Sequence, residues 1–297
     1  MFRGLSAFPL TPCTPEGIDD AGFLRILERL VNAGVDSLGV LGSTGSYAYL
    51  TREQRKRVAA LAKQQAGAIP VMVSIGAVGT AQVLQLAEDA QHAGADALLL
   101  PAMSYQTLTD DEVFGLFETV SRHVSVPVCV YDNPGTTRFT FSDDLHGRIA
   151  ALPRIGSIKI PGVPADAAAA HARVQQLRGK IPAGVTLGVS GDAFAGLGLN
   201  AGCEVWYSVC GGLFPHTAKA ITDAAARGDH ARVTQLTERL APLWALFRQH
   251  GGSIRVMAAA AGVLGLTQVD CLPRPLLPLP EAHCAAVAAV IEELGLE

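Results

Sequence analysis

The chain has 297 residues, of which 49% are hydrophobic and 17% charged, and its formal net charge is -4. This is the composition of an ordinary globular chain that can bury a sizeable core. Its basic residues are scattered, so we expect no nucleic-acid partner. The sequence has no apolar run of about eighteen residues, and its start lacks the long apolar core of a signal peptide. We therefore expect no membrane span and a cytoplasmic location.

The cysteines and histidines do not form a recognisable metal-binding pattern. The six cysteines are widely spaced and include no Cys-x-x-Cys pair, which predicts buried free thiols rather than a zinc or redox site. They are Cys13, Cys129, Cys203, Cys210, Cys271 and Cys284. The histidines fall mostly on predicted helices, and we expect them to be solvated. They are His92, His123, His146, His171, His216, His230, His250 and His283. The sequence thus predicts no metal.

Short apolar runs alternate with longer helical patterns along most of the chain. The predicted strands cover residues 5–8, 37–41, 70–75, 97–100, 126–131, 155–160, 186–189 and 204–209. Capping signals predict helix starts between them, at Thr51 with Gln54, Thr80, Thr109 with Glu112, and Ser142. Eight strands at a spacing of about thirty residues predict a (β/α)₈ barrel, with a doubly wound open sheet as the alternative. No Gly-x-Gly-x-x-Gly follows the first strand, which weakens that alternative.

The chain continues for about ninety residues after the last predicted strand. Its periodicity predicts helices over residues 217–228, 230–250, 253–264 and 281–294, with a proline-rich connector before the last one. The first of these is the eighth helix of the barrel. We therefore predict a barrel of residues 1–228 and a C-terminal helical extension of residues 229–297 that packs on it.

One lysine, Lys159, stands in the middle of the predicted buried strand 155–160, whereas the other lysines fall on amphipathic helical stretches or beside a turn. Burying an unpaired ammonium costs several kcal/mol, and the usual escape is a lowered pKa that leaves a neutral amine. Such an amine attacks ketones and aldehydes to form a Schiff base. In the alternative, the Lys159 head reaches out at a strand end or pairs with a carboxylate. The strand alone does not decide between them.

Polar residues gather where other predicted strands end, which is where a barrel places its active site. Ser43 and Thr44, in Gly-Ser-Thr-Gly, offer hydroxyls and backbone N–H groups to a carboxylate or phosphate. The alternative is a glycine turn whose hydroxyls cap the next helix. Tyr131 ends the strand before that of Lys159, close enough to exchange protons with a carbinolamine. The alternative is a packing residue with a solvated hydroxyl.

Several ordered motifs together resemble a known family. They are Gly-Ser-Thr-Gly at 42–45, Tyr-Asp-Asn-Pro-Gly-Thr-Thr at 131–137, Ile-Lys at 158–159, and Ser-Gly-Asp at 190–192. This set is similar to that of the dihydrodipicolinate synthase / N-acetylneuraminate lyase family of class I pyruvate-dependent aldolases. Phe-Arg-Gly at 2–4 and Leu-Pro-Arg-Pro-Leu at 272–276 also fit. The resemblance covers essentially the whole chain.

The resemblance implies roles for individual residues. Lys159 matches the lysine that forms an imine with pyruvate or another 2-oxo acid, without any other cofactor. Tyr131 matches the tyrosine that shuttles protons. Thr44 matches the hydroxyl that links it to a second tyrosine lent by a neighbouring subunit, for which Tyr105 is the candidate. Ser43 and Thr44 also match groups that hold the 2-oxo acid carboxylate.

The resemblance extends to the last predicted strand and to assembly. Tyr207, next to Ser208, matches a position that contacts the pyruvate moiety. If a neighbour's tyrosine completes the proton relay, the active unit is at least a homodimer, and the resemblance suggests a homotetramer. The implied partners are a small 2-oxo acid and an aldehyde. The imine is expected to lower the pKa of the Tyr131 phenol toward the working range.

The chain departs from the family pattern around the expected acceptor. The synthase branch carries an arginine five residues after the tyrosine, where this chain has Thr136, and Arg138 follows two residues later. Ser46 replaces a common glutamate and Gly212 a common asparagine. In the lyase branch, a second acid stands where this chain has Ala193. These changes leave the 2-oxo acid chemistry in place but do not identify the acceptor.

Several functions therefore stay open. The main expectation is a Schiff-base-forming lyase or aldolase that acts on pyruvate or a related 2-oxo acid. An aldolase or dehydratase for a sugar-derived or hydroxyproline-derived 2-oxo acid is the alternative, and Thr136 does not favour a lysine-biosynthetic synthase. A non-catalytic 2-oxo acid binding relative is a further alternative, against which the intact Lys159, Tyr131 and Thr44 argue. A phosphate-binding barrel enzyme is a further alternative, with Gly211-Gly212 as its one sequence signal.

Overall fold

The computed structural model describes all 297 residues, and eight parallel strands close into a barrel in the order β1-β10-β9-β8-β7-β6-β5-β4. The strands are β1 (Gly4–Ala7), β4 (Ser37–Val40), β5 (Val71–Ser74), β6 (Ala97–Pro101), β7 (Val128–Tyr131), β8 (Ile155–Ile160), β9 (Thr186–Val189) and β10 (Val205–Ser208). The first strand, β1, pairs with both β10 and β4, which closes the barrel. The barrel prediction is confirmed, and the open-sheet alternative is wrong.

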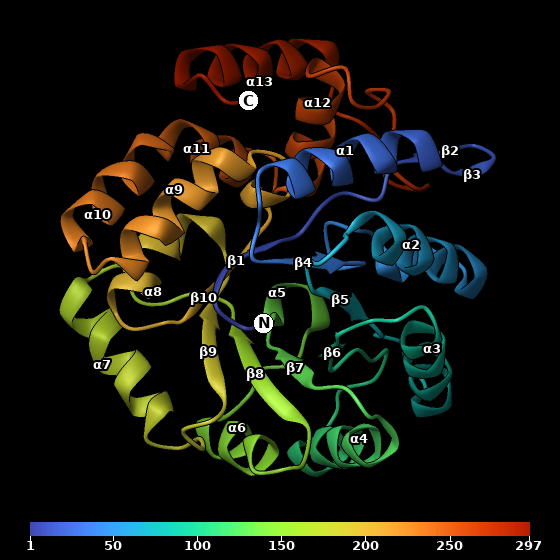
Figure 1. Cartoon of the computed structure of the whole chain (residues 1–297), viewed down its shortest axis with the longest axis vertical. Coiled ribbons are helices and arrows are strands. Elements are labelled where there is room, and N and C mark those ends of the chain that lie inside the picture. Colours follow the sequence, from blue (N-terminus) through green and yellow to red (C-terminus); the bar gives the residue numbers. More distant parts are fainter.

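A ring of helices surrounds the strands (Figure 1). They are α1 (Asp20–Asn32), α2 (Arg52–Gln65), α3 (Thr80–His92), α4 (Asp110–His123), α6 (Asp143–Ala150), α7 (Ala167–Arg178), α8 (Ala195–Asn200) and α9 (Pro215–Ala226). Thr51 and Thr109 form the expected capping boxes, and Ser142 caps α6. The prediction for Thr80 is wrong, because it is the first helical residue and Gly79 holds the cap position.

Short elements fill the loops. A small hairpin, β2 (Cys13–Thr14) with β3 (Gly17–Ile18), was not predicted because two-residue strands carry no periodicity. The short helices are η1 (Tyr47–Tyr49), α5 (Pro134–Thr137), η2 (Asp192–Phe194) and η3 (Cys210–Gly212). Figure 1 shows α5 over the centre of the ring, which places the loop after β7 across the barrel.

The apolar side chains form two separate cores. A cluster of 79 buried residues fills the space between strands and helices and extends into the last helices. A second cluster of eight fills the barrel interior, because alternate strand side chains point inward. Its members are Phe8, Met72, Ala97, Leu99, Cys129, Tyr131, Val205 and Tyr207. Two tyrosines thus belong to the interior of the barrel.

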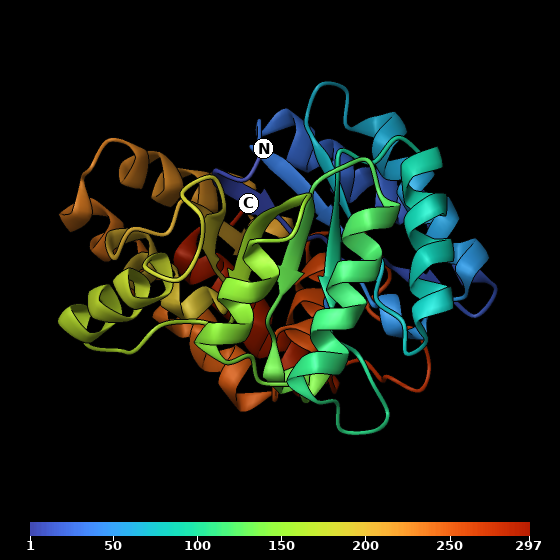
Figure 2. The ribbon, with the colours of Figure 1, turned by 90° about the horizontal axis from the view of Figure 1, so that it is seen from below.

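The last helices pack outside the ring. They are α10 (His230–Arg239), α11 (Ala241–Gln249), α12 (Ile254–Val263) and α13 (Glu281–Leu294). The prediction of a single helix over residues 230–250 is wrong. The helix breaks at Leu240, because Pro242 has no N–H and is tolerated only in the first turn of α11. In Figure 2 the red part of the chain lies behind the layer formed by α4 and α6, and orange helices lie toward the left of the view. The division at residue 228 stays a prediction.

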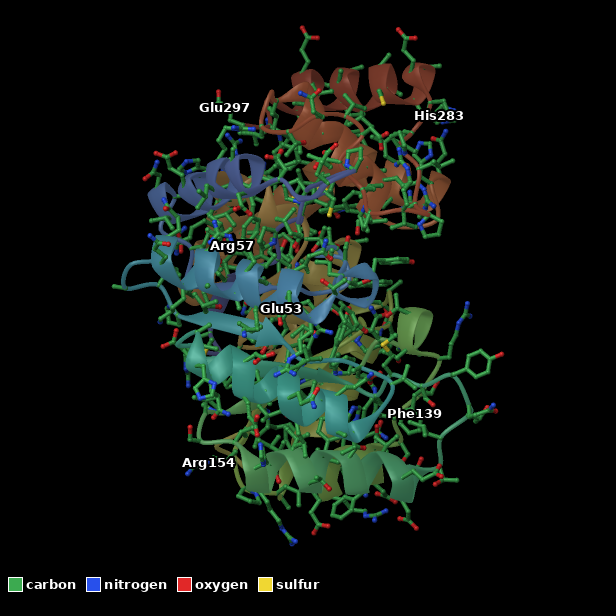
Figure 3. All side chains as sticks on the ribbon, turned by 90° about the vertical axis from the view of Figure 1, so that its right-hand side faces the viewer. Glu53, Arg57, Phe139, Arg154, His283 and Glu297 are labelled. Carbon is green, nitrogen blue, oxygen red and sulfur yellow. The ribbon has the colours of Figure 1, made fainter.

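The two ends of the barrel can be told apart in Figure 3. Arg154, just before β8, and Phe139, shortly after β7, lie on opposite sides of the molecule. His283, at the start of α13, lies on the side of Phe139. The C-terminal helices therefore reach the end of the barrel where the strands finish. None of the helices has both the length and the apolar character needed to cross a membrane.

Candidate active site

Lys159 lies inside the barrel without an ionic partner. It is 6% exposed, and the lysine ion pairs of the structure are made by other residues, Lys63, Lys180 and Lys219. Aromatic rings surround its Nζ instead, which lies 4.5 Å from the ring centroid of Tyr131, 5.5 Å from that of Phe8 and 6.0 Å from that of Tyr207. The structure therefore contradicts the alternative of a solvated or carboxylate-paired head.

This environment changes the protonation of Lys159. Burial lowers its pKa to about 8, an effect that is opposed first by Cys129 and then by the carboxylates of Asp192 and Asp132. A lysine with this pKa is neutral in roughly one molecule in ten at pH 7, against fewer than about one in a thousand for an ordinary lysine. A neutral, buried amine is a nucleophile for a carbonyl group.

Tyr131 stands directly beside Lys159. The two residues pair in register on β7 and β8, and the Tyr131 hydroxyl accepts a hydrogen bond of 2.8 Å from Asn133 Nδ2. Burial raises the pKa of Tyr131, opposed by hydrogen bonds with Asn133, Ser43 and Thr136. Tyr131 is therefore a neutral phenol in the free protein and can first act as a proton donor.

A cavity of about 430 Å³ brings most of the predicted residues together. Lys159, Tyr131, Ser43 and Thr44 all line it. Thr44 is only 5% exposed, and Ser43 is close enough to Tyr131 to act against the rise of its pKa. A small ligand in this cavity can therefore meet the amine, the phenol and both hydroxyls at once.

Tyr207 lines the same cavity, but its hydroxyl is already occupied. The hydroxyl lies 2.6 Å from Ser157 Oγ and accepts a 3.4 Å hydrogen bond from Cys129 Sγ. Its ring packs over Gly188, which is opposite Lys159 on β9 and where a Cβ would overlap the ring. Ser208 does not line the cavity: it is fully buried, and its Oγ accepts a hydrogen bond from the Gly211 N–H.

Tyr105 and Arg138 lie away from this cavity in their own chain. Tyr105 is 89% exposed, in the loop between β6 and α4. Arg138 is also exposed, with a left-handed φ of 63° at the end of α5. The side chain of Thr136, by contrast, is within the cavity wall.

One wall of the cavity comes from the C-terminal helices and was not predicted from the sequence. Trp244, Phe247 and Arg248 line it from α11, followed by Gly251 to Ile254. The three α11 residues are spaced i, i+3 and i+4, so they share one helix face. This spacing was readable in the sequence, but it does not tell which surface the face will meet.

A buried histidine was also missed. His146 on α6 is 1% exposed, and its ring stacks on Phe141 at a centroid distance of 5.0 Å. Its Nε2 lies 3.3 Å from Oδ2 of Asp132, the residue after Tyr131. The expectation of solvated histidines is therefore wrong for His146, because α6 packs this face against the end of β7.

Asp192 ties together the ends of two strands. Its carboxylate accepts hydrogen bonds from Trp206 Nε1 at 3.0 Å, the Val209 N–H at 3.2 Å and the Cys210 N–H at 2.6 Å. The Asp192 carboxylate thus braces the loop after β9 against β10.

The glycines after β10 serve packing. Gly211 and Gly212 are buried, and a Cβ at Gly212 would overlap the backbone carbonyl of Phe8. They form no open loop for a phosphate, which removes the support for the phosphate-binding alternative. All six cysteines are free thiols, five of them buried, as predicted. No three His, Cys, Asp or Glu side chains are grouped so that they could hold a metal ion.

A closed (β/α)₈ barrel with this lysine and phenol in one cavity defines a class of enzyme. It is that of the class I aldolases and lyases that act on pyruvate or a related 2-oxo acid. The chain belongs to the dihydrodipicolinate synthetase family, whose sequence model matches residues 1–294. The resemblance noted from the motifs is confirmed.

Individual relatives cover the chain from end to end. It is 30% identical over 302 residues to 4-hydroxy-tetrahydrodipicolinate synthase of Parvibaculum lavamentivorans, covering 100% of this chain and 99% of the relative. It is 31% identical over 300 residues to the protein of that name in Phenylobacterium zucineum, covering 100% and 98%. A solved structure of dihydrodipicolinate synthase from Agrobacterium tumefaciens is 44% identical, with a TM-score of 0.94 and coverage of 99% and 98%.

Proposed function

We propose that Lys159 forms a covalent imine with the keto carbon of pyruvate or a related 2-oxo acid, with Tyr131 as the acid and base. The observation that carries this proposal is the buried Lys159 amine, whose pKa is lowered to about 8 and which has no carboxylate partner. In this proposal, protein side chains carry out the reaction, and no metal or other cofactor is needed.

The order of steps follows from the protonation states. The neutral Lys159 amine adds to the keto carbon and gives a carbinolamine. Tyr131 donates its phenol proton as the carbinolamine loses water, and the iminium ion forms. The positive nitrogen withdraws electrons from the adjacent methyl group, which loses a proton to the Tyr131 phenolate to give an enamine and restore the phenol. The enamine attacks an aldehyde, or the reverse sequence cleaves a carbon–carbon bond.

Ser43 and Thr44 are proposed to hold the carboxylate of the 2-oxo acid. Both line the cavity with Lys159, and hydroxyl and backbone N–H donors suit an anion. Tyr207 is proposed to contact the same moiety with its ring, since its hydroxyl is bonded to Ser157. Ser208 is proposed to support this contact from outside the cavity, since it is buried next to Tyr207.

Tyr105 is proposed to act in a neighbouring subunit, joined to Tyr131 through Thr44. Its exposure in its own chain leaves it free to do so. The active unit is then a homodimer or homotetramer. A cytoplasmic location is proposed as well, and free thiols at all six cysteines support it.

The curated relatives, both named as synthases, support carbon–carbon bond formation with an aldehyde as the reaction. The neutral Thr136 in the cavity wall keeps a dehydratase or a sugar-acid aldolase as the second candidate.

Trapping with borohydride tests the proposal. Pyruvate is mixed with the protein, the imine is reduced to a stable amine, and peptides are analysed by mass spectrometry. We expect one reduced pyruvyl group on the Lys159 peptide, none in Lys159→Ala, and an unchanged adduct in Lys56→Ala, which removes an exposed helical lysine.

The other outcomes separate the remaining functions. An adduct with a longer 2-oxo acid but not with pyruvate would favour a dehydratase or a lyase for a bulkier substrate. No adduct with any 2-oxo acid would overturn the covalent mechanism and leave a non-catalytic relative.

A further inference from the structure

Arg248 is a cation without a partner in the wall of the cavity. Of the residues that line the cavity, only Lys159 and Arg248 carry a positive charge. The Arg248 guanidinium takes part in none of the ion pairs or side-chain hydrogen bonds of the structure. The arginines that do form ion pairs are Arg52, Arg57, Arg122, Arg148, Arg173, Arg178 and Arg274.

The cavity offers no anion to neutralise this charge. Its one acidic residue, Asp192, already accepts hydrogen bonds from Trp206 and from the backbone of Val209 and Cys210. The Arg248 guanidinium is therefore free to bind a negative group of a ligand, and it carries five donors in a planar fork that matches a carboxylate.

The surroundings of Arg248 place it at the solvent side of the cavity. Trp244 and Phe247 stand on the same face of α11 and line the cavity beside it. Arg248 itself is exposed, so water partly screens its charge, and its contact with an anion is weaker than a buried ion pair. No other arginine lines the cavity, since Arg138 lies outside it and Thr136 is neutral.

We propose that Arg248 binds a second carboxylate of the substrate, at the end remote from the keto carbon. The inference rests on the proposed function, in which Lys159 takes the keto carbon and Ser43 with Thr44 takes the first carboxylate. Those groups leave Arg248 as the cation for any further negative charge. The substrate class is thus a 2-oxo dicarboxylic acid, formed or cleaved as the product of a 2-oxo acid and a carboxylated aldehyde.

The test uses two ligand pairs that differ only at the remote end. 2-Oxoglutarate is compared with 2-oxovalerate, and 2-oxoadipate with 2-oxohexanoate, so that a carboxylate replaces a methyl group at constant chain length. The half-saturating concentration for borohydride trapping on Lys159 is measured for each. In the wild type we expect at least one dicarboxylate to half-saturate at a concentration about threefold to fivefold below that of its methyl-ended partner, as for an ionic contact with an exposed arginine.

Variants at two arginines assign that preference. Arg248→Gln should reduce the ratio between the two ligands to nearly one, and Arg248→Lys should keep part of it, because lysine retains the charge without the fork. Arg227→Gln, which removes an exposed arginine at the end of α9, should leave the ratio as in the wild type. Added salt should lower the ratio in the wild type more than in Arg248→Gln.

The outcomes distinguish this inference from the proposed function. If Lys159 traps the monocarboxylates and dicarboxylates equally well, or if Arg248→Gln keeps the wild-type ratio, the role of Arg248 is overturned while the Schiff base stands. If the wild type traps no 2-oxo acid at all, the proposed function fails, and the assignment of Arg248 fails with it.

Discussion

The β7 side and the β10 side of Lys159 each present a buried tyrosine, yet the two hydroxyls have different surroundings. Both Tyr131 and Tyr207 are 2% exposed, and both rings lie within about 6 Å of the lysine nitrogen. The Tyr131 hydroxyl is bonded to Asn133, in the cavity wall. The Tyr207 hydroxyl is bonded to Ser157, on β8 in the barrel. Proximity to the lysine therefore does not by itself assign a role in proton transfer.

The bonds on the β10 side form a closed polar chain. Thr186 Oγ1 donates to Ser157 Oγ at 2.8 Å, and Ser157 meets the Tyr207 hydroxyl at 2.6 Å. Burial raises the pKa of Tyr207 well above its usual value, so this phenol is held neutral. We infer that Tyr131 transfers protons and that Tyr207 holds the wall of the cavity beside Lys159 in place.

The largest effect that would test this comparison is expected for Tyr131→Phe. The substitution keeps the ring beside Lys159 and removes only the hydroxyl. Because a positioned acid or base contributes about 10²- to 10⁴-fold, we expect the rate of imine formation with pyruvate to fall by a factor in that range. Adding borohydride after set reaction times measures the rate of imine formation, and circular dichroism shows whether the barrel is folded. A variant that forms the imine at the wild-type rate would contradict the assignment.

A smaller effect on rate and a measurable effect on stability are expected for Tyr207→Phe. Imine formation should slow by less than about tenfold, while the free energy of unfolding should fall by about 0.5–1.5 kcal/mol, because Ser157 loses one hydrogen bond but keeps those with Thr186. Urea unfolding measures the second quantity. Ser157→Ala and the double variant provide a matched cycle, in which the two losses should not add. If folded Tyr207→Phe forms the imine as slowly as Tyr131→Phe does, the two tyrosines do not differ in their role in proton transfer.

Local sequence patterns were enough to predict the barrel fold and the pair of Lys159 and Tyr131. The alternation of apolar runs and capped helices predicted all eight strands, because the chain repeats one unit of a buried strand followed by a helix. Lys159 and Tyr131 were found because each stands at a readable place on its strand, and adjacent strands in a parallel barrel bring such places together.

The other features of the site depend on packing between residues far apart in the sequence, which local sequence patterns do not reveal. The bond between Tyr207 and Ser157 depends on Gly188, which leaves room for the tyrosine ring from a strand in between. The placement of Arg248 depends on a helix break at Leu240 that turns α11 over the cavity. A helical period predicts that a face will be buried, but it does not name the partner.

The two sides also differ in how their carboxylates are bonded. Asp192 accepts three hydrogen bonds. Asp132 has one oxygen without a hydrogen-bond partner, and its other oxygen lies 3.3 Å from His146 Nε2. Both carboxylates raise the pKa of Lys159 against the larger effect of burial, which brings it to about 8. An Asp132→Asn substitution should therefore disturb the structure less than Asp192→Asn.

The smallest expected effect is a shift of the pH profile in Asp132→Asn. In the wild type, the rate of imine formation should rise with pH through about 8, as Lys159 loses its proton. Removing the Asp132 charge removes a stabilisation of the ammonium, so the pKa of Lys159 falls and the rise moves to lower pH. Trapping rates measured between about pH 6 and pH 9.5 determine the midpoint. Asp192→Asn should instead lower the stability, since an amide NH₂ would face N–H donors. An unmoved midpoint in folded Asp132→Asn would show that the β7 carboxylate does not act on the lysine.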